Sequence, residues 1–292
     1  MRKFTSVLTA TALEILSEPL SLLVLLAALA MTVLAPAFHY HQFGESTRMA
    51  RDAGFSALFT CGSVLAVFGT IRAFRREVES GTMEMALAHP VSRTTFFLAK
   101  TAGAAVAYLV FALIVFGTQL TIVWGAAVGG ILASKSGDVA SVFEPALAAG
   151  VAVIVAPLVL AAILNRFARF RFVLTSFVVA LVLALLCGGA TFAIAPDLLA
   201  PYPAAAILVA CPALVLLAAS AAFGLRFKAN AAASSVGLVF AALLPAVGNY
   251  YLSDALTNFA SIPLTYVLLA LAAALPAIAL FLLVGVASDS AA

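Results

Sequence analysis

Long apolar runs separated by short polar stretches dominate the chain. Each run approaches or exceeds the roughly 20 residues that an α-helix needs to cross the hydrocarbon core of a bilayer. The run at 233–251 contains Pro245 and Gly248, so it either crosses or re-enters the membrane. The pattern predicts an all-α fold, a polytopic bundle of about six to eight transmembrane helices. The runs lie at residues 20–38, 54–71, 101–128, 145–164, 172–195, 203–225, 233–251 and 264–286.

Composition agrees with this interpretation. Of the 292 residues, 65% are apolar and 9% are charged, and the mean hydropathy is +1.20. Soluble domains carry about a quarter charged residues, so an integral membrane protein is expected. We expect one transmembrane domain over residues 1–292. The net charge of +3 gives no reason to expect nucleic acid as a partner.

Residues 1–19 form a distinct amphipathic lead-in. Its apolar residues recur at helical spacing, and Pro19 ends the pattern. We therefore expect a helix that lies along the membrane interface in contact with lipid. The alternative is an ordinary cytosolic lead-in. The residues near the apolar face are Phe4, Val7, Leu8, Ala12, Ile15 and Leu16.

The distribution of Lys and Arg predicts the orientation, because cytoplasmic loops carry an excess of both. With the amino terminus inside, twelve of these residues fall on the inner side and three, Arg48, Arg51 and Lys135, on the outer side. Both termini are then cytoplasmic. So is the longest polar interruption, residues 72–100 between the second and third spans.

The spans carry no charged residue away from their ends, which argues against a transporter driven by an ion gradient. Their mild polar residues are expected to make interhelical hydrogen bonds or to line a weakly polar cavity. These residues are Thr60, Ser63, Thr118, Gln119 and Thr121. Four glycines are expected to let helices approach closely, namely Gly62, Gly69, Gly103 and Gly117.

The 72–100 segment is divided by residues that stop and start helices. Gly81 can end the helix that enters it, since glycine tolerates a left-handed cap. Thr82 can cap a new short helix, which Pro90 then terminates. Ser92 can cap the helix that leads into the third span. The sequence therefore predicts three helical pieces, the middle one short.

At this point the residues carry a family resemblance. The run Glu79-Ser80-Gly81-Thr82-Met83-Glu84, then Pro90-Val91-Ser92-Arg93, then Lys100, is similar to a segment of type-two ABC exporter permeases. In that family the segment joins the second and third spans. The helix that ends in Ser17-Glu18-Pro19 and the short basic turn Asn165–Arg171 also resemble it.

The resemblance implies a transport subunit without catalytic residues, metal or cofactor of its own. It also implies that the chain pairs with a permease, as a homodimer or a heterodimer, in a bacterial-type cytoplasmic membrane. The dimer is then expected to act in export. ATP and Mg²⁺ are then expected in a separate ATP-binding subunit, and this chain has no GxxxxGK[ST] phosphate loop.

Within that resemblance, residues 72–100 act as a cytoplasmic coupling segment that docks on the ATP-binding subunit. Charged groups are expected to fix its geometry, small or rigid residues to shape it, and apolar side chains to contact the partner. The first set is Glu79, Glu84 and Arg93, the second Gly81, Thr82 and Pro90, and the third Met83, Met85 and Leu87.

Two other classes of function stay open at this stage. One is a membrane enzyme that acts on lipid or a lipid-linked substrate, for which His89 with Glu84 is the suggestive pair. The other is a membrane scaffold protein. For a transporter, the largely apolar spans leave lipid, drug, small peptide, polysaccharide precursor and metal-related cargo open.

Overall fold

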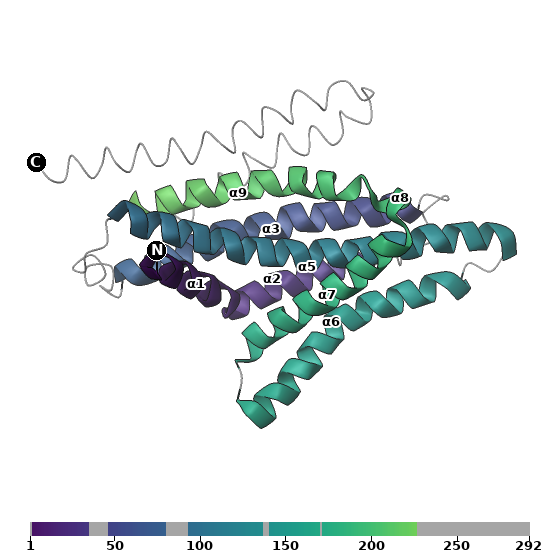
Figure 1. Ribbon diagram of the computed structural model, residues 1–292, viewed down its shortest axis with the longest axis horizontal. Coiled ribbons are helices and arrows are strands. Elements are labelled where there is room, and N and C mark those ends of the chain that lie inside the picture. Colours follow the sequence, from purple (N-terminus) through teal and green to yellow (C-terminus); the bar gives the residue numbers. More distant parts are fainter. Residues whose placement is uncertain (1, 35–45, 80–92, 137–139, 170, 227–292) are drawn as a thin grey trace, which may run out of the picture. The chain divides into compact units, whose positions relative to one another are not determined.

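The described part of the chain is helical throughout (Figure 1). The structure, a computed structural model, describes residues 2–34, 46–79, 93–136, 140–169 and 171–226. This confirms the predicted all-α class. The helices are α1 (Arg2–Leu16), α2 (Pro19–Leu34), α3 (Ser46–Glu79), α5 (Arg93–Ser136), α6 (Ala140–Ala168), α7 (Phe172–Ile194), α8 (Pro196–Leu199) and α9 (Tyr202–Arg226).

The helices account for the first six predicted spans. In the described residues, five helices are long and apolar enough to cross a membrane, or six if α1 and α2 count as one broken span. The predicted runs at 233–251 and 264–286 lie outside the described residues. A multi-pass membrane protein is therefore confirmed. The five are Thr47–Arg76, Thr94–Val128, Gly150–Phe167, Phe172–Ile194 and Pro196–Ala218.

Prolines set several helix boundaries. Pro19 is the first residue of α2, where its missing N–H costs nothing. The carbonyl oxygen of Glu18 accepts hydrogen bonds from the backbone N–H groups of Ser21 and Leu22, at 3.1 and 3.4 Å. At the other end of the apolar series, Pro196 follows one residue after α7 and opens the short helix α8. The predicted break after the amphipathic lead-in is thus confirmed.

The described helices form two compact units. The first contains α1 through Ile15, α3 from Ser63, α5 through Ala107, and α9 from Ala210. The second contains α2, α6, α7 and α8 with the remaining parts of α3, α5 and α9. Helices α3, α5 and α9 thus contribute several residues to each unit, and the units do not follow one another along the chain. The single transmembrane domain stays a prediction.

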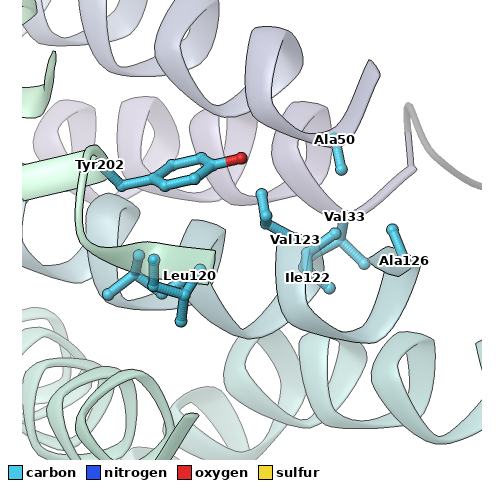
Figure 2. Packing of buried hydrophobic residues seen from close by; sticks show 8 residues of the cluster. Val33, Ala50, Leu120, Ile122, Val123, Ala126 and Tyr202 are labelled. Carbon is cyan, nitrogen blue, oxygen red and sulfur yellow. The ribbon is translucent and has the colours of Figure 1, made fainter. Parts of the chain in front are cut away.

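Buried apolar side chains from five helices form the core cluster of the second unit (Figure 2). The ring of Phe55 on α3 stacks on that of Tyr202 at the start of α9, with centroids 6.1 Å apart. Because lipid is itself apolar, such contacts stabilise the helices by close van der Waals packing and not by removal of apolar surface from water. The cluster consists of Val33, Ala50, Leu120, Ile122, Val123, Ala126, Leu199 and Tyr202.

Close approach at glycine, predicted from the sequence, is confirmed in this unit between α5 and α7. A Cβ on Gly117 would collide with the carbonyl oxygen of Ala184. A Cβ on Gly188 would lie 2.7 Å from the carbonyl oxygen of Gly117. Because the obstructing atoms are backbone, any side chain here would force the two helices apart.

The mid-span polar residues differ from the expectation. The hydroxyls of Thr60, Thr118 and Thr121 donate to carbonyls of their own helices, at 2.6, 2.8 and 3.2 Å. The expected bond between helices is made by Gln119 on α5, whose Nε2 donates to the carbonyl oxygen of Arg51 on α3 at 2.9 Å. A threonine can satisfy its hydroxyl locally, whereas the longer glutamine side chain reaches a neighbouring helix.

Candidate functional site

The structure describes the two helices that flank the predicted coupling segment. Glu79 is the last described residue of α3, and Arg93 is the first residue of α5. The predicted helix stop at Gly81 and the predicted cap at Ser92 lie outside the described residues. The remaining site residues lie outside the described residues, so the short middle helix stays a prediction. They are Gly81, Thr82, Met83, Glu84, Met85 and Pro90.

Lys100 joins the two flanking helices. It lies on α5, two turns after Arg93, and its side chain is fully buried at 0% exposure. Its Nζ donates a hydrogen bond of 2.7 Å to the carbonyl oxygen of Ala73 on α3. The bond spans 27 residues of sequence and therefore closes the loop that contains the coupling segment.

Aromatic rings surround the Lys100 ammonium group on both helices. Nζ lies 5.1 Å from the ring centroid of Phe74 on α3 and 6.0 Å from that of Phe96 on α5. The Phe74 ring also packs against Phe97, with centroids 5.5 Å apart and planes inclined by 40°. A cation at such distances is attracted to the face of the ring. These residues, with Ala73, are called the Lys100 cluster below.

The cluster offsets the cost of burying a charge. Removing an ammonium group from water costs on the order of several kcal/mol of free energy, even after the protein has relaxed around it. The hydrogen bond to the Ala73 carbonyl oxygen and the two aromatic rings offset part of this cost, because they attract the ammonium group in place of the water that it has lost. A buried cation held in this way specifies the register of α3 against α5 more than it adds stability.

Helix α1 packs against both flanking helices in the same unit. On α5, a Cβ on Gly103 would lie 2.5 Å from the carbonyl oxygen of Leu8 and 2.9 Å from Cβ of Thr11. On α3, a Cβ on Gly69 would lie 3.2 Å from Cγ2 of Ile15. The close approaches predicted for Gly69 and Gly103 are thus confirmed. A helix seated on both neighbours restrains their separation.

An ion pair adds a polar contact between α1 and α3. Nη1 of Arg76 lies 3.4 Å from Oε1 of Glu14, with side-chain exposures of 67% and 27%. An exposed pair of this kind contributes little to stability, about 0–1 kcal/mol. The apolar and backbone contacts, rather than this pair, therefore hold α1 in place.

The importance of Lys100 was only partly visible in the sequence. The family motif includes Lys100, but a lysine at the start of a span is typically interpreted as an interfacial residue. The Lys100 side chain is fully buried because Ala73, Phe74 and Phe96 surround it, and no local sequence pattern connects Ala73 and Phe74 with Lys100. The spacing of Phe96 and Lys100 by four residues is the available signal, because it places both on one helix face.

The part of the chain that the structure describes contains no group of three His, Cys, Asp or Glu side chains placed to hold a metal ion. The pair suggested for a lipid enzyme, Glu84 and His89, lies outside the described residues. In the arrangement that the structure does describe, the Lys100 hydrogen bond joins α3 to α5, and α1 packs against both helices.

Comparison with protein families identifies the class of protein. Residues 8–188, well over half of the chain, match the family described as ABC-2 family transporter protein. The match runs from α1 to α7 and includes both helices that flank the coupling segment. No curated protein and no solved structure matches the chain. Membrane proteins of this family are transport permeases rather than enzymes, and they work with an ABC ATP-binding partner. The chain therefore belongs to the ABC-2 transporter family, as a multi-pass permease subunit of an ABC transporter.

Proposed function

We propose that this permease forms the substrate path of an ATP-driven exporter together with a second permease, either another copy or a related chain. ATP and Mg²⁺ bind in a separate subunit, which docks on the cytoplasmic face at residues 72–100. The twelve-to-three distribution of Lys and Arg supports this orientation, with both termini in the cytoplasm of a bacterial-type cell. The missing phosphate-loop motif supports a motor on another polypeptide.

The link made by Lys100 is the observation that carries the coupling role. A segment that only connected two spans would move each of them independently. Here α3 and α5 are bonded to one another through Ala73 and Lys100, at the two ends of the segment. A displacement of the segment therefore acts on the two helices as one body, which is what a transmission element requires.

Both helices are long enough to carry such a movement through the membrane. Helix α3 extends over 34 residues and α5 over 44, and each contributes to both compact units. At about 1.5 Å of rise per residue, each exceeds the roughly 30 Å of a hydrocarbon core. Because each helix has residues in both units, a displacement of its residues in the first unit is passed along the helix backbone to its residues in the second.

The predicted site residues have distinct roles in this proposal. Glu79, Glu84 and Arg93 fix the geometry of the coupling segment through charge. Gly81, Thr82 and Pro90 divide it into short helical pieces, and Met83 and Met85 contact the ATP-binding subunit. Methionine suits this role because its flexible side chain adapts to a moving surface.

The test uses Gly81→Val and Arg93→Glu in the full chain, co-expressed with its ABC ATP-binding subunit. We expect loss of co-purification, or ATP hydrolysis without transport. Gly189→Val is the matched control, because a Cβ at Gly189 meets nothing within 4 Å. If both variants assemble and transport like the unmodified protein, residues 72–100 are not the coupling segment.

A further inference from the structure

A second polar feature lies at the turn between α6 and α7. Three arginines and a phenylalanine occur there within six residues, and all four side chains are exposed. We call this set, Arg166, Phe167, Arg169 and Arg171, the basic turn. The coupling proposal makes no use of it.

The guanidinium groups of the basic turn have no protein partner in the part of the chain that the structure describes. The other arginines with described side chains all do. Arg76 pairs with Glu14, Arg48 and Arg51 pair with Asp52, and Arg72 and Arg75 also make contacts. No Asp or Glu occurs in the sequence between Glu144 and Asp197. The turn is therefore a concentrated positive charge without a counter-charge from its own neighbourhood.

The lengths of the adjacent spans place this charge at the membrane surface. The apolar stretch Gly150–Phe167 has 18 residues, and the stretch Phe172–Ile194 has 23. At about 1.5 Å per residue these correspond to roughly 27 and 34 Å, close to the thickness of a hydrocarbon core. The residues that join them have no room to project far beyond the headgroups. Only 22% and 28% of the two stretches are buried, as expected of helices that face lipid.

Phe167 strengthens the case for lipid over a protein partner. It is 85% exposed, more than any other large apolar side chain in the described residues. A phenylalanine ring at the end of a span can bury itself at the boundary between the headgroups and the acyl chains. The neighbouring guanidinium groups then lie at the level of the phosphates, for which their planar array of donors is suited.

The backbone of the turn fits the same ligand. Arg169 adopts φ 54°, a left-handed conformation that reverses the chain within a few residues of Ala168. No side chain caps the amino end of α7 at Arg171. The amino end of a helix attracts anions, so a phosphate there is held by backbone dipoles as well as by arginine.

We propose that the basic turn is a binding site for anionic phospholipid, in which Arg166, Arg169 and Arg171 hold the phosphodiester headgroup and Phe167 inserts at the interface. The site selects lipid by charge, because zwitterionic headgroups present no net negative charge to the three arginines. Binding of this kind anchors the α6–α7 hairpin to the cytoplasmic leaflet. It is independent of whether residues 72–100 couple to an ATP-binding subunit.

The test is native mass spectrometry of the full-length permease in detergent micelles with equal amounts of phosphatidylglycerol and phosphatidylcholine. We expect a preference for phosphatidylglycerol that Arg169→Gln lowers by about fivefold, the factor equivalent to ~1 kcal/mol per cationic side chain near an anionic surface. The triple variant R166Q/R169Q/R171Q should lower it by more than about tenfold. Arg48→Gln is the matched control and leaves the preference unchanged, because Arg48 already pairs with Asp52 at 3.8 Å.

Thermal melting of each variant shows that it is folded, and Phe167→Ser is a second variant that keeps the charge. Phe167→Ser should weaken retention of phosphatidylglycerol and phosphatidylcholine alike, since it removes insertion rather than charge. An unchanged preference in the triple variant overturns the proposal. If that variant keeps the lipid preference and also loses the ATP-binding subunit on purification, the basic turn binds protein instead of lipid.

Discussion

The replacement Lys100→Met isolates the function of the buried cation. Methionine keeps an unbranched side chain of similar length between Phe74 and Phe96, so the packing of the cluster is preserved. It removes the charge and the 2.7 Å hydrogen bond to the carbonyl oxygen of Ala73. The contact between the two helices at this position then becomes apolar, which permits local sliding where the Lys100 hydrogen bond fixes the register.

The expected change in stability is small. A hydrogen bond from a charged group contributes about 1.5–3 kcal/mol, and each cation–ring contact about 0.5–2 kcal/mol. Methionine, in contrast, has no charge to desolvate, which avoids a cost on the order of several kcal/mol. It also gains about 0.3–1.5 kcal/mol for each contact between its sulfur and an aromatic ring. Because the losses and the gains are of similar size and opposite sign, we expect the net change in the free energy of unfolding to be smaller than either total. Lys100→Ala, by contrast, leaves a cavity and costs about 2–5 kcal/mol.

The assay is the ratio of substrate transported to ATP hydrolysed by the reconstituted complex, measured beside the melting temperature. We expect Lys100→Met to assemble and melt near the unmodified protein, with a reduced transport ratio. Lys100→Arg, which retains the charge, should recover part of it. Thr118→Val is the control, because the Thr118 hydroxyl bonds within its own helix at 2.8 Å. An unchanged ratio in a folded Lys100→Met complex refutes the reasoning.

Two further predictions concern packing. Gly103→Ala should lower stability by about 1–3 kcal/mol through overpacking, because the new Cβ meets the Leu8 carbonyl oxygen at 2.5 Å. Gly189→Ala, with nothing within 4 Å, should be neutral or slightly stabilising in thermal melts. Equal melting of the two variants contradicts the close approach of α1 to α5. Gln119→Leu should cost about 0.5–1.5 kcal/mol by removing the bond to the Arg51 carbonyl, without changing the transport ratio. A loss of that ratio in folded protein contradicts a purely structural role for Gln119.

Several helix boundaries in the described residues could be predicted from the sequence because they depend on local features. The predicted span 172–195 is observed as α7, Phe172–Ile194, since an apolar run bounded by Arg171 and Pro196 leaves little choice. Helix α3 begins at Ser46, well before the predicted 54. Its first turns are polar and carry Arg48 and Asp52 as an i,i+4 ion pair, which favours a helix but lowers the hydropathy.

The candidate site was less accessible from sequence. The helix ends that capping chemistry predicts around Gly81 and Ser92 lie outside the described residues and stay predictions. The burial of Lys100 depends on contacts across 27 residues, to which hydropathy is blind. The threonine hydroxyls illustrate the same limit, because sequence shows that a donor is present but not which carbonyl accepts its bond.

Cross-linking between the permease and its ATP-binding subunit tests the central claim most directly. The free cysteines Cys61, Cys187 and Cys211 are first replaced by alanine. A single cysteine is then placed at Met83, or at the exposed Met49 near the start of α3 as the control. With a bifunctional maleimide, Met83→Cys is predicted to join the ATP-binding subunit and Met49→Cys is not. Cross-linking from Met49→Cys alone would contradict both the orientation and the coupling role of residues 72–100.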